Sequence, residues 1–278
     1  MALRSSQNAP LRSSADASKA KSSSGISPQA LQSQVLSRIT KLNDRDTTEN
    51  GAEMLRALAA ELRGEELGLM LRTCCSQLNT DAGTSQPRDK QLRPFARARL
   101  VQLLGDAGAA SSVRLTRKTL VWLCRSMVRT SSDGDSSVRD AAACALSVLA
   151  EGTVAGGGPL PADAAATPDA AGGSGGGGGS GGAGGEAAVL SIFLKPIFEH
   201  LALLEKRAQV GAALCLAKLI FKVGGEALIP TLPRLCARLA QRLEAPGCAA
   251  HSELLQVRIF VIWGVVLCGF CCLSPACC

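Results

Sequence analysis

The chain has 278 residues, of which 3% are aromatic and none is tyrosine, and its formal net charge is +7. β-Sandwiches and β-barrels are built from strands rich in β-branched and aromatic residues. The sequence has no such strands, so it excludes these folds and predicts an all-α protein. The basic balance favours an acidic partner. Nucleic acid is not the expected partner, because the basic segments lack the interleaved aromatic residues on which single-stranded bases stack.

Residues 1–27 are rich in serine, alanine and basic residues and have almost no apolar side chains to bury. We therefore expect a disordered N-terminal segment. A basic, serine-rich start with few acidic residues is also typical of plastid transit peptides, which is an open alternative.

The first helix pair is predicted between residues 28 and 64. Ser27-Pro28 is a favourable helix start. The first helix has apolar residues on one face, namely Leu31, Val35, Leu36, Ile39 and Leu42. After a polar break at residues 43–48, Thr47 or Thr48 is expected to cap a second helix that ends at Gly64. Its apolar residues are Met54, Leu55, Leu58 and Leu62.

Further helices are predicted at residues 65–78, from Pro94 onward and at residues 113–129. The stretch from Asp133 to Ala150 then joins an aspartate-bearing turn to another helix. Asp133 and Asp135 precede this helix, where a carboxylate accepts hydrogen bonds from free backbone N–H groups. The apolar stripe of the helix has mostly small residues, so a second helix can approach closely. These residues are Ala142, Ala145, Leu146 and Leu149.

Related helices begin near Pro94 and Ala208, each about 40 residues from this one once a Gly-rich insert is left out. Helix pairs that repeat every 40 to 47 residues or so are typical of HEAT and armadillo arrays. We therefore predict an all-α, HEAT/armadillo-like α-solenoid of about five helix-pair repeats at residues 28–256, the last one incomplete.

The insert occupies residues 152–185 and consists mainly of Gly, Ala, Pro and Ser. This composition predicts a flexible, disordered coil, and no Lys follows the glycines as it would in a phosphate-binding loop. The folded array is expected to resume at Ala187, with Pro196 kinking the next helix or marking its start. An outer helix is predicted at residues 229–243, and its inner partner begins near His251.

Residues 257–278 form an apolar, Cys-rich tail. Its uncharged part, residues 259–273, is shorter than the roughly 17–20 residues of a membrane-spanning helix. A tail anchor aided by acylated cysteines is one alternative, and a metal cluster of these cysteines is a less favoured one. The preferred hypothesis is that the repeat is cut off at Gln256 and that the tail is translated non-coding sequence. Sequencing the transcript there tests it, since an uninterrupted exon would contradict it.

The sequence predicts a non-enzymatic protein without a metal or cofactor. His200 and His251 are isolated, and no paired carboxylates, Ser/His/Asp set or zinc pattern can be assembled. Several cysteines lie on apolar helix faces, where a free thiol behaves as a small hydrophobe. They are Cys74, Cys124, Cys144, Cys215 and Cys236. No secretory signal precedes them, so we expect a reducing compartment.

Four segments follow one another at repeat spacing. They read R-I-T-K-L-N-D-R-D-T (residues 38–47), S-S-V-R-D-A (136–141), F-L-K-P-I-F-E (193–199) and K-R-A-Q-V-G-A-A-L-C-L-A-K-L-I (206–220). In this order they resemble the N-terminal region of the plant TORTIFOLIA/SPIRAL microtubule-associated proteins, over roughly residues 30–256. The L-x-D-R-D-T and K-P-x-F-E parts are the more specific ones, whereas V-R-D-A is common in HEAT repeats.

The resemblance implies binding to microtubules or tubulin through a TOG-like HEAT array, and an influence on cortical microtubules and on the direction of organ growth. It places the protein in the cytoplasm, at the cytoskeleton. Because helix-pair repeats align their intra-repeat turns along one edge, we expect the contacts there. The candidate residues are Asn43, Asp44, Arg45, Asp46, Arg88, Lys90, Asp133, Glu205, Lys206 and Arg207.

Tubulin's surface is acidic, so the basic members of this set would attract it, less strongly as salt rises. A simpler interpretation is that Asp44 and Asp46 only cap helices and that the charged turns are solvated. Two other functions stay open: a generic HEAT scaffold for protein partners, and a membrane protein anchored through residues 259–273.

Overall fold

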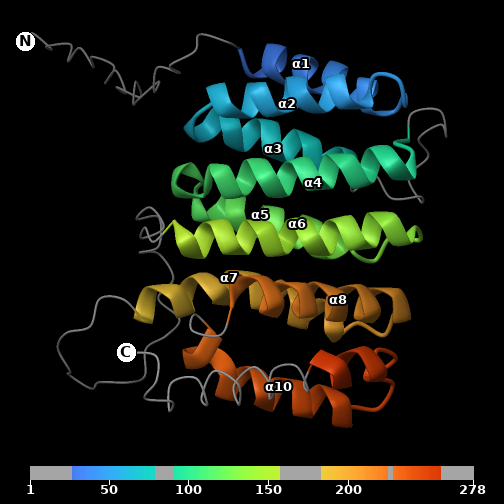
Figure 1. The fold of residues 1–278 in the computed structure, drawn as a ribbon, viewed down its shortest axis with the longest axis vertical. Helices are drawn as coiled ribbons and strands as arrows, with labels where there is room; N and C mark the ends of the chain where they lie inside the picture. The colour runs from blue at the N-terminus through green and yellow to red at the C-terminus, as the bar shows by residue number, and fades with distance from the viewer. Residues whose placement is uncertain (1–26, 79–90, 157–182, 225–227, 258–278) are drawn as a thin grey trace, which may run out of the picture.

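The structure, a computed structural model, describes residues 27–78, 91–156, 183–224 and 228–257. These residues form antiparallel helix pairs stacked one on the next (Figure 1). The pairs are α1 (Pro28–Leu42) with α2 (Thr48–Glu61), α3 (Gly64–Leu78) with α4 (Pro94–Ala110), α5 (Arg117–Thr130) with α6 (Ser136–Ala155), and α7 (Ala183–Leu201) with α8 (Lys206–Val223). Helix α10 (Leu232–Glu244) follows, and residues 251–257 are helical again.

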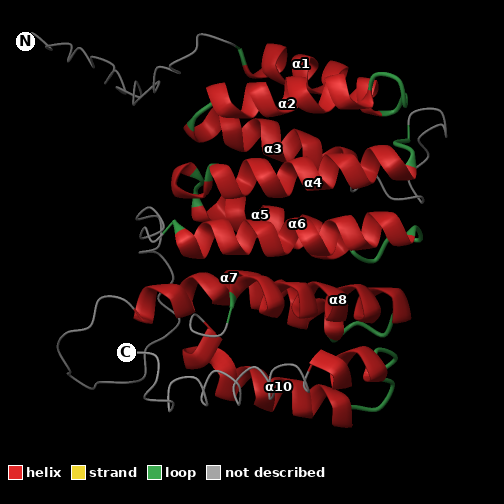
Figure 2. Cartoon of the chain, viewed as in Figure 1, coloured by secondary structure: helices red, strands yellow, loops and turns green. Residues whose placement is uncertain are grey.

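Short 3-10 helices at Ser112–Arg114 (η2) and Ile229–Thr231 (η4) precede α5 and α10. Figure 2 shows helices and connecting loops, and no strand occurs in the described ranges. The predicted all-α, solenoid-like fold is confirmed. The number of repeats stays a prediction, since the tail at residues 258–278 lies outside the described residues.

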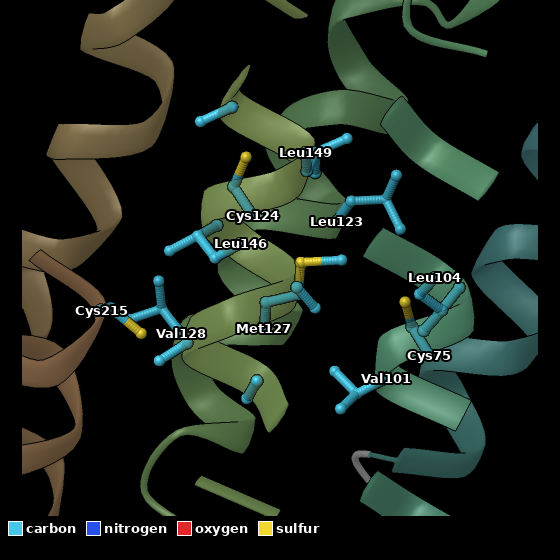
Figure 3. Close-up of a cluster of buried hydrophobic side chains, with 14 of the residues drawn as sticks. Cys75, Val101, Leu104, Leu123, Cys124, Met127, Val128, Leu146, Leu149 and Cys215 are labelled. Atoms are coloured by element: carbon cyan, nitrogen blue, oxygen red, sulfur yellow. The ribbon is translucent and has the colours of Figure 1, made fainter. Parts of the chain in front are cut away.

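The helices form two layers. In the inner layer, α2 packs on α4, α4 on α6 and α6 on α8, whereas in the outer layer α1 packs on α3, α3 on α5 and α5 on α7. One hydrophobic core runs between the layers from Leu31 to Val257. Figure 3 shows part of it, where Cys75, Leu104, Met127, Leu146 and Cys215 bring together side chains from five helices. Burial of this continuous core is the main stabilising term of such an array.

Helices α4 and α6 approach each other closely along one seam, as the stripe of small residues predicted. Ala142, Ala145, Leu146 and Leu149 are all buried. A Cβ placed on Gly105 of α4 would lie 2.7 Å from the Cα of Ala145, so only glycine fits there. The expectation that small residues allow close packing is confirmed.

Some predicted helix boundaries were wrong. Thr47 stands at the N-cap of α2, but its hydroxyl donates to the Lys41 carbonyl (2.7 Å) instead of capping the helix. Gly64, with φ of 54°, opens α3, since α2 already ends at Glu61. The helix expected at residues 113–129 begins at Arg117. Of the two alternatives for Pro196, the start of a helix is excluded, since the residue lies inside α7, and a kink stays a prediction.

The predicted Gly-rich insert was also too long at both ends. Helix α6 continues to Ala155, and α7 already begins at Ala183. Gly152 has a poor helix propensity. It is outweighed by the good helix propensity of Ala155 and by the core contacts of the last α6 turn, including those of buried Thr153.

Leu36 was expected on the buried face of α1, but it is exposed.

A candidate partner-binding edge

The turns within the helix pairs lie along one edge of the molecule, on the right in Figure 1. They are residues 43–47, the segment 91–93 before α4, residues 131–135, residues 202–205 and residues 245–250. We call these turns the intra-repeat edge. Its neighbouring turns are connected by specific contacts, which are described first because they decide which side chains are left for a partner.

Asn43 joins the first turn to the second. Its side-chain Nδ2 donates to the Gln91 carbonyl (3.3 Å), and its Oδ1 accepts from the backbone N–H of Arg93 (2.7 Å). Both ends of the amide are therefore used inside the protein. Asn43 lies on the edge as expected, but these bonds give it a bridging role.

Asp44, Arg45 and Asp46 are exposed at the tip of the first turn. The Asp44 carboxylate accepts from the backbone N–H of Asp46 (3.2 Å), which closes a small turn of the kind that aspartate favours. The guanidinium carbon of Arg45 lies 5.6 Å from the centre of the Phe95 ring, within the range of a cation–π contact. This contact pre-positions a cation at the surface.

Asp133 joins the third turn to α4. Its Oδ2 lies 2.6 Å from Nη1 of Arg97, and its Oδ1 accepts from the N–H of Asp135 (2.9 Å). The Asp133 side chain is only 12% exposed. Arg139 completes the network by donating to the Asp133 and Gly134 carbonyls (2.9 and 3.0 Å). Asp133 is thus largely used in bracing its own turn.

We expect Asp133→Ala to lower the free energy of unfolding by about 2 kcal/mol, because a charged hydrogen bond is lost and Arg97 stays half-buried without its carboxylate. Urea unfolding measures this. Asp46→Ala, which removes an exposed carboxylate from the first turn, is the control and is expected to change the stability by less than about 0.5 kcal/mol. Equal effects of the two variants would contradict the bracing role.

Asp135 caps α6. Its Oδ1 accepts from the Ser137 hydroxyl (2.6 Å) and from the Ser137 N–H (2.9 Å). These bonds, the hydroxyl bond first, hold the pKa of the Asp135 carboxyl below its usual value. The sequence had placed Asp133 and Asp135 together before the helix, and Asp135 forms the cap.

Gln209 joins the fourth turn to the fifth. It is buried, and its Nε2 donates to the Leu203 carbonyl (2.6 Å) and the Gly247 carbonyl (3.4 Å). Its Oε1 accepts from the Ala249 N–H (2.6 Å). Sequence reasoning missed this residue, although a glutamine within the apolar run of residues 208–220 is a signal of an internal polar bridge.

Glu205, Lys206 and Arg207 are exposed where α8 begins. Arg207 also lies near the third turn, since its Nη1 would be 3.7 Å from a Cβ built on Gly134. Lys206 and Arg207 therefore place two cations between the third and fourth turns. Arg88 and Lys90, the remaining candidates, lie outside the described residues.

Leu203 and Leu204 lie directly beside these cations and were missed by the sequence analysis. They are 45% and 90% exposed, and they occupy the same turn as Glu205. Large apolar side chains with this exposure are often contact residues when polar groups surround them. The sequence contained a signal for their exposure. The pair follows Leu201, the last buried leucine of α7, and precedes the core residues of α8, so it belongs to neither buried face.

Four fully buried cysteines of the described chain have thiols that are hard to ionise. Burial raises the pKa of Cys75 and of Cys215 to about 12, and it raises the pKa of Cys74 and Cys124 further. A thiol must ionise to act as a nucleophile, so these four are poor candidates. Within the described ranges, no three His, Cys, Asp or Glu side chains are grouped so that they could hold a metal ion.

In the part of the chain that the structure describes, none of the helices has the length and hydropathy to cross a membrane. The apolar residues 259–273, on which the anchor alternative depends, lie outside that part.

Comparison with known proteins agrees with the resemblance found in the four segments. The family model described as TORTIFOLIA1 N-terminal matches residues 29–267. The chain is 26% identical over 261 residues to microtubule-associated protein TORTIFOLIA1 of Arabidopsis thaliana, which covers 89% of this chain and 26% of that protein. It is 24% identical over 228 residues to TORTIFOLIA1-like protein 1 of the same plant, which covers 82% of this chain and 24% of that protein.

The chain thus spans about a quarter of the length of these relatives. The family match continues past Gln256, so the relationship does not stop where the sequence analysis ended the array. A match over most of the chain, together with the helix-pair fold, shows that the chain belongs to the TORTIFOLIA1 N-terminal family.

Proposed function

We propose that this chain is a non-enzymatic microtubule-binding module that contacts tubulin through its intra-repeat edge. The similarity to microtubule-associated protein TORTIFOLIA1 supports the choice of partner. The single observation that carries the contact surface is the alignment of the turns on one side, with their tips exposed (Figure 1). Loops that a helical-repeat protein presents on one face often form its binding face.

Within the edge, we assign attraction to the exposed cations. Arg45, Lys206 and Arg207 are free of strong carboxylate contacts among the described residues, unlike Arg97, which is paired with Asp133. Arg88 and Lys90 are proposed members of the same set. These cations complement the acidic surface of tubulin in charge. They would therefore raise the rate of encounter as well as the affinity.

Apolar contact would come from Leu203 and Leu204. Binding surfaces gain most of their affinity from a few large side chains that lose water, and charged rims contribute less. An exposed leucine pair beside two cations fits this pattern. The acidic candidates Asp44, Asp46 and Glu205 would oppose an acidic surface, so we propose that they limit where the edge can dock. Asn43 and Asp133 act by holding the turns in place.

The proposed location follows from the partner: cortical microtubules in the cytoplasm, where binding would influence microtubule organisation. Residues 28–256 are proposed as the binding body, with the termini and the insert as separate segments. The alternative of a generic HEAT scaffold differs in one measurable respect, since it requires no affinity for tubulin.

Co-sedimentation with polymerised microtubules tests the proposal. At low ionic strength of about 0.01 M, where screening extends over about 30 Å, most of the chain is expected in the pellet. Raising the salt to about 0.15 M, with screening over about 8 Å, should release a large part of it. The chain spun without microtubules controls for self-association. Failure to pellet at low salt would favour the scaffold.

A further inference from the structure

A second charged surface lies on the outer layer, away from the intra-repeat edge. It is formed by the exposed cations of α5, α7 and α10, and we call it the outer cationic face. Its members are Lys118, Arg125, Arg129, Lys195, Arg234 and Arg238. The proposed tubulin contact uses none of them.

Helix α5 supplies half of this face. Its sequence from Arg117 to Thr130 has no acidic residue, and Lys118, Arg125 and Arg129 recur at spacings of seven and four. Such spacing places them on one side of a helix. The opposite side, with Leu120, Leu123, Cys124, Met127 and Val128, is fully buried. The cations therefore point away from the core.

Contacts across α7 place the cations of α5 and α10 on one continuous surface. From one side, Nη2 of Arg125 lies 3.9 Å from the Glu199 carboxylate. From the other side, the guanidinium of Arg238 lies 5.5 Å from the centre of the Phe198 ring. Phe198 and Glu199 are adjacent residues of α7, so the two arginines flank the same turn of that helix.

Helix α10 is held in this position by Arg242, whose Nε donates to the Leu201 carbonyl at the end of α7 (2.6 Å). Leu235 and Leu239 of α10 are buried, and Arg234 and Arg238 on the other side are exposed. Because α10 is anchored through the Leu201 carbonyl and through its own buried leucines, Arg234 and Arg238 are not needed for the anchoring and are available at the surface.

The charge on this face is nearly of one sign. Glu199 is the one carboxylate within the described side chains of α7, and α10 adds only Glu244 in its last turn. The inner layer differs, since exposed acids such as Glu49, Glu53, Asp106 and Asp140 are interspersed with its bases.

The chemistry of this face favours carboxylates over other anions. Four of its six cations are arginines, whose planar guanidinium groups can bind a carboxylate through two hydrogen bonds. Phe198 is half-buried beneath Arg238, so it offers no open ring for stacking a nucleic-acid base. None of the exposed large apolar residues of the described chain belongs to α5, α7 or α10, although Val113 and Ile229 lie in the 3-10 helices η2 and η4 that precede α5 and α10. The helices of this face therefore have no large apolar side chain to insert into a membrane.

We propose that the outer cationic face binds flexible acidic polypeptide segments, rich in glutamate or aspartate, as a second interaction surface. A flexible chain can settle its carboxylates along cations spread over three helices, whereas a rigid partner would need a matching shape. The proposal does not rest on tubulin binding by the edge.

The test uses the full chain and poly-L-glutamate as the probe, with binding followed by fluorescence anisotropy at low salt. Three cations without described hydrogen bonds are removed together in Lys118→Ala/Arg129→Ala/Arg234→Ala. We expect binding about tenfold weaker than for the unchanged chain, because three exposed ion pairs are lost. The matched control is Arg56→Ala/Arg63→Ala/Arg72→Ala, which removes the same charge from exposed positions near the N-terminal end and should bind nearly as well as the unchanged chain.

Equal weakening by the two triple variants would show that only net charge matters and would overturn the proposal. So would an absence of poly-L-glutamate binding. Tighter binding to phosphatidylserine vesicles than to poly-L-glutamate, with the same dependence on the three cations, would overturn it in favour of a membrane surface. The Lys206→Glu/Arg207→Glu variant separates the two sites, since it should keep poly-L-glutamate binding whether or not the edge binds tubulin.

Discussion

Reversing the charges of Lys206 and Arg207 to glutamate is expected to weaken microtubule binding by at least about tenfold, since exposed ion pairs contribute up to about 1 kcal/mol each and reversal adds repulsion. Both side chains are exposed at the start of α8. They lie between the third and fourth turns, beside the exposed Leu203 and Leu204. This is the part of the edge where positive charge and apolar surface coincide. Co-sedimentation at several salt concentrations measures the loss.

The control reverses two exposed cations away from this edge, Arg63 in the α2–α3 connection and Arg72 on α3. It changes the net charge by the same amount, so a specific edge contact predicts little effect. Thermal unfolding should be similar for both variants, because all four side chains are solvated. If the control lost as much binding as the edge variant, attraction by overall charge would explain the result, and the edge would lose its assigned role.

Gly211→Ala is expected to lower the free energy of unfolding by about 2–3 kcal/mol, because overpacking a tight contact forces backbone shifts. Gly211 lies in the first part of α8, where the helix passes the third turn. A Cβ at this position would overlap the Ser131 carbonyl oxygen and would lie 2.6 Å from its carbonyl carbon. Ser131 is itself fully buried, with its hydroxyl donating to the Val128 carbonyl (2.7 Å), so it cannot move aside easily.

Gly134→Ala provides the control in the same turn. Its Cβ would meet nothing closer than the end of Arg207, at 3.7 Å, and the residue is exposed. We expect a stability change of less than about 0.5 kcal/mol from it. Circular dichroism melts compare the two alanine variants. An unchanged melting temperature for the Gly211 variant would mean that α8 does not approach the third turn as closely as described.

The sequence was sufficient for the helices and for the side on which the turns lie. The apolar spacing in α1, and the small stripe of α6 with Ala142 and Ala145, are local signals that survive in the fold. Helix ends were less predictable, because core contacts in the last turn decide them. The extension of α6 to Ala155 through Gly152 shows this, since Gly152 packs against Ala109.

The roles of the edge residues could not be separated from the sequence. Asn43, Asp133 and Lys206 all read as polar residues in turns. Only the fold shows that Asn43 and Asp133 contact other turns, while Lys206 stays exposed. Partners distant in sequence decide this, such as Arg97 for Asp133. The assignment of individual residues to tubulin contact stays a prediction until the charge-reversal variants are measured.

The close packing at the α4–α6 seam also has a mechanical consequence. With Gly105 against Ala145 and Gly152 against Ala109, the backbones touch without a cushion of long side chains between them. Long side chains change rotamer under load, whereas touching backbones can only separate. We therefore expect the middle of the stack to resist bending more than the joints on either side of it, where the elastic bending of the molecule under tension would concentrate.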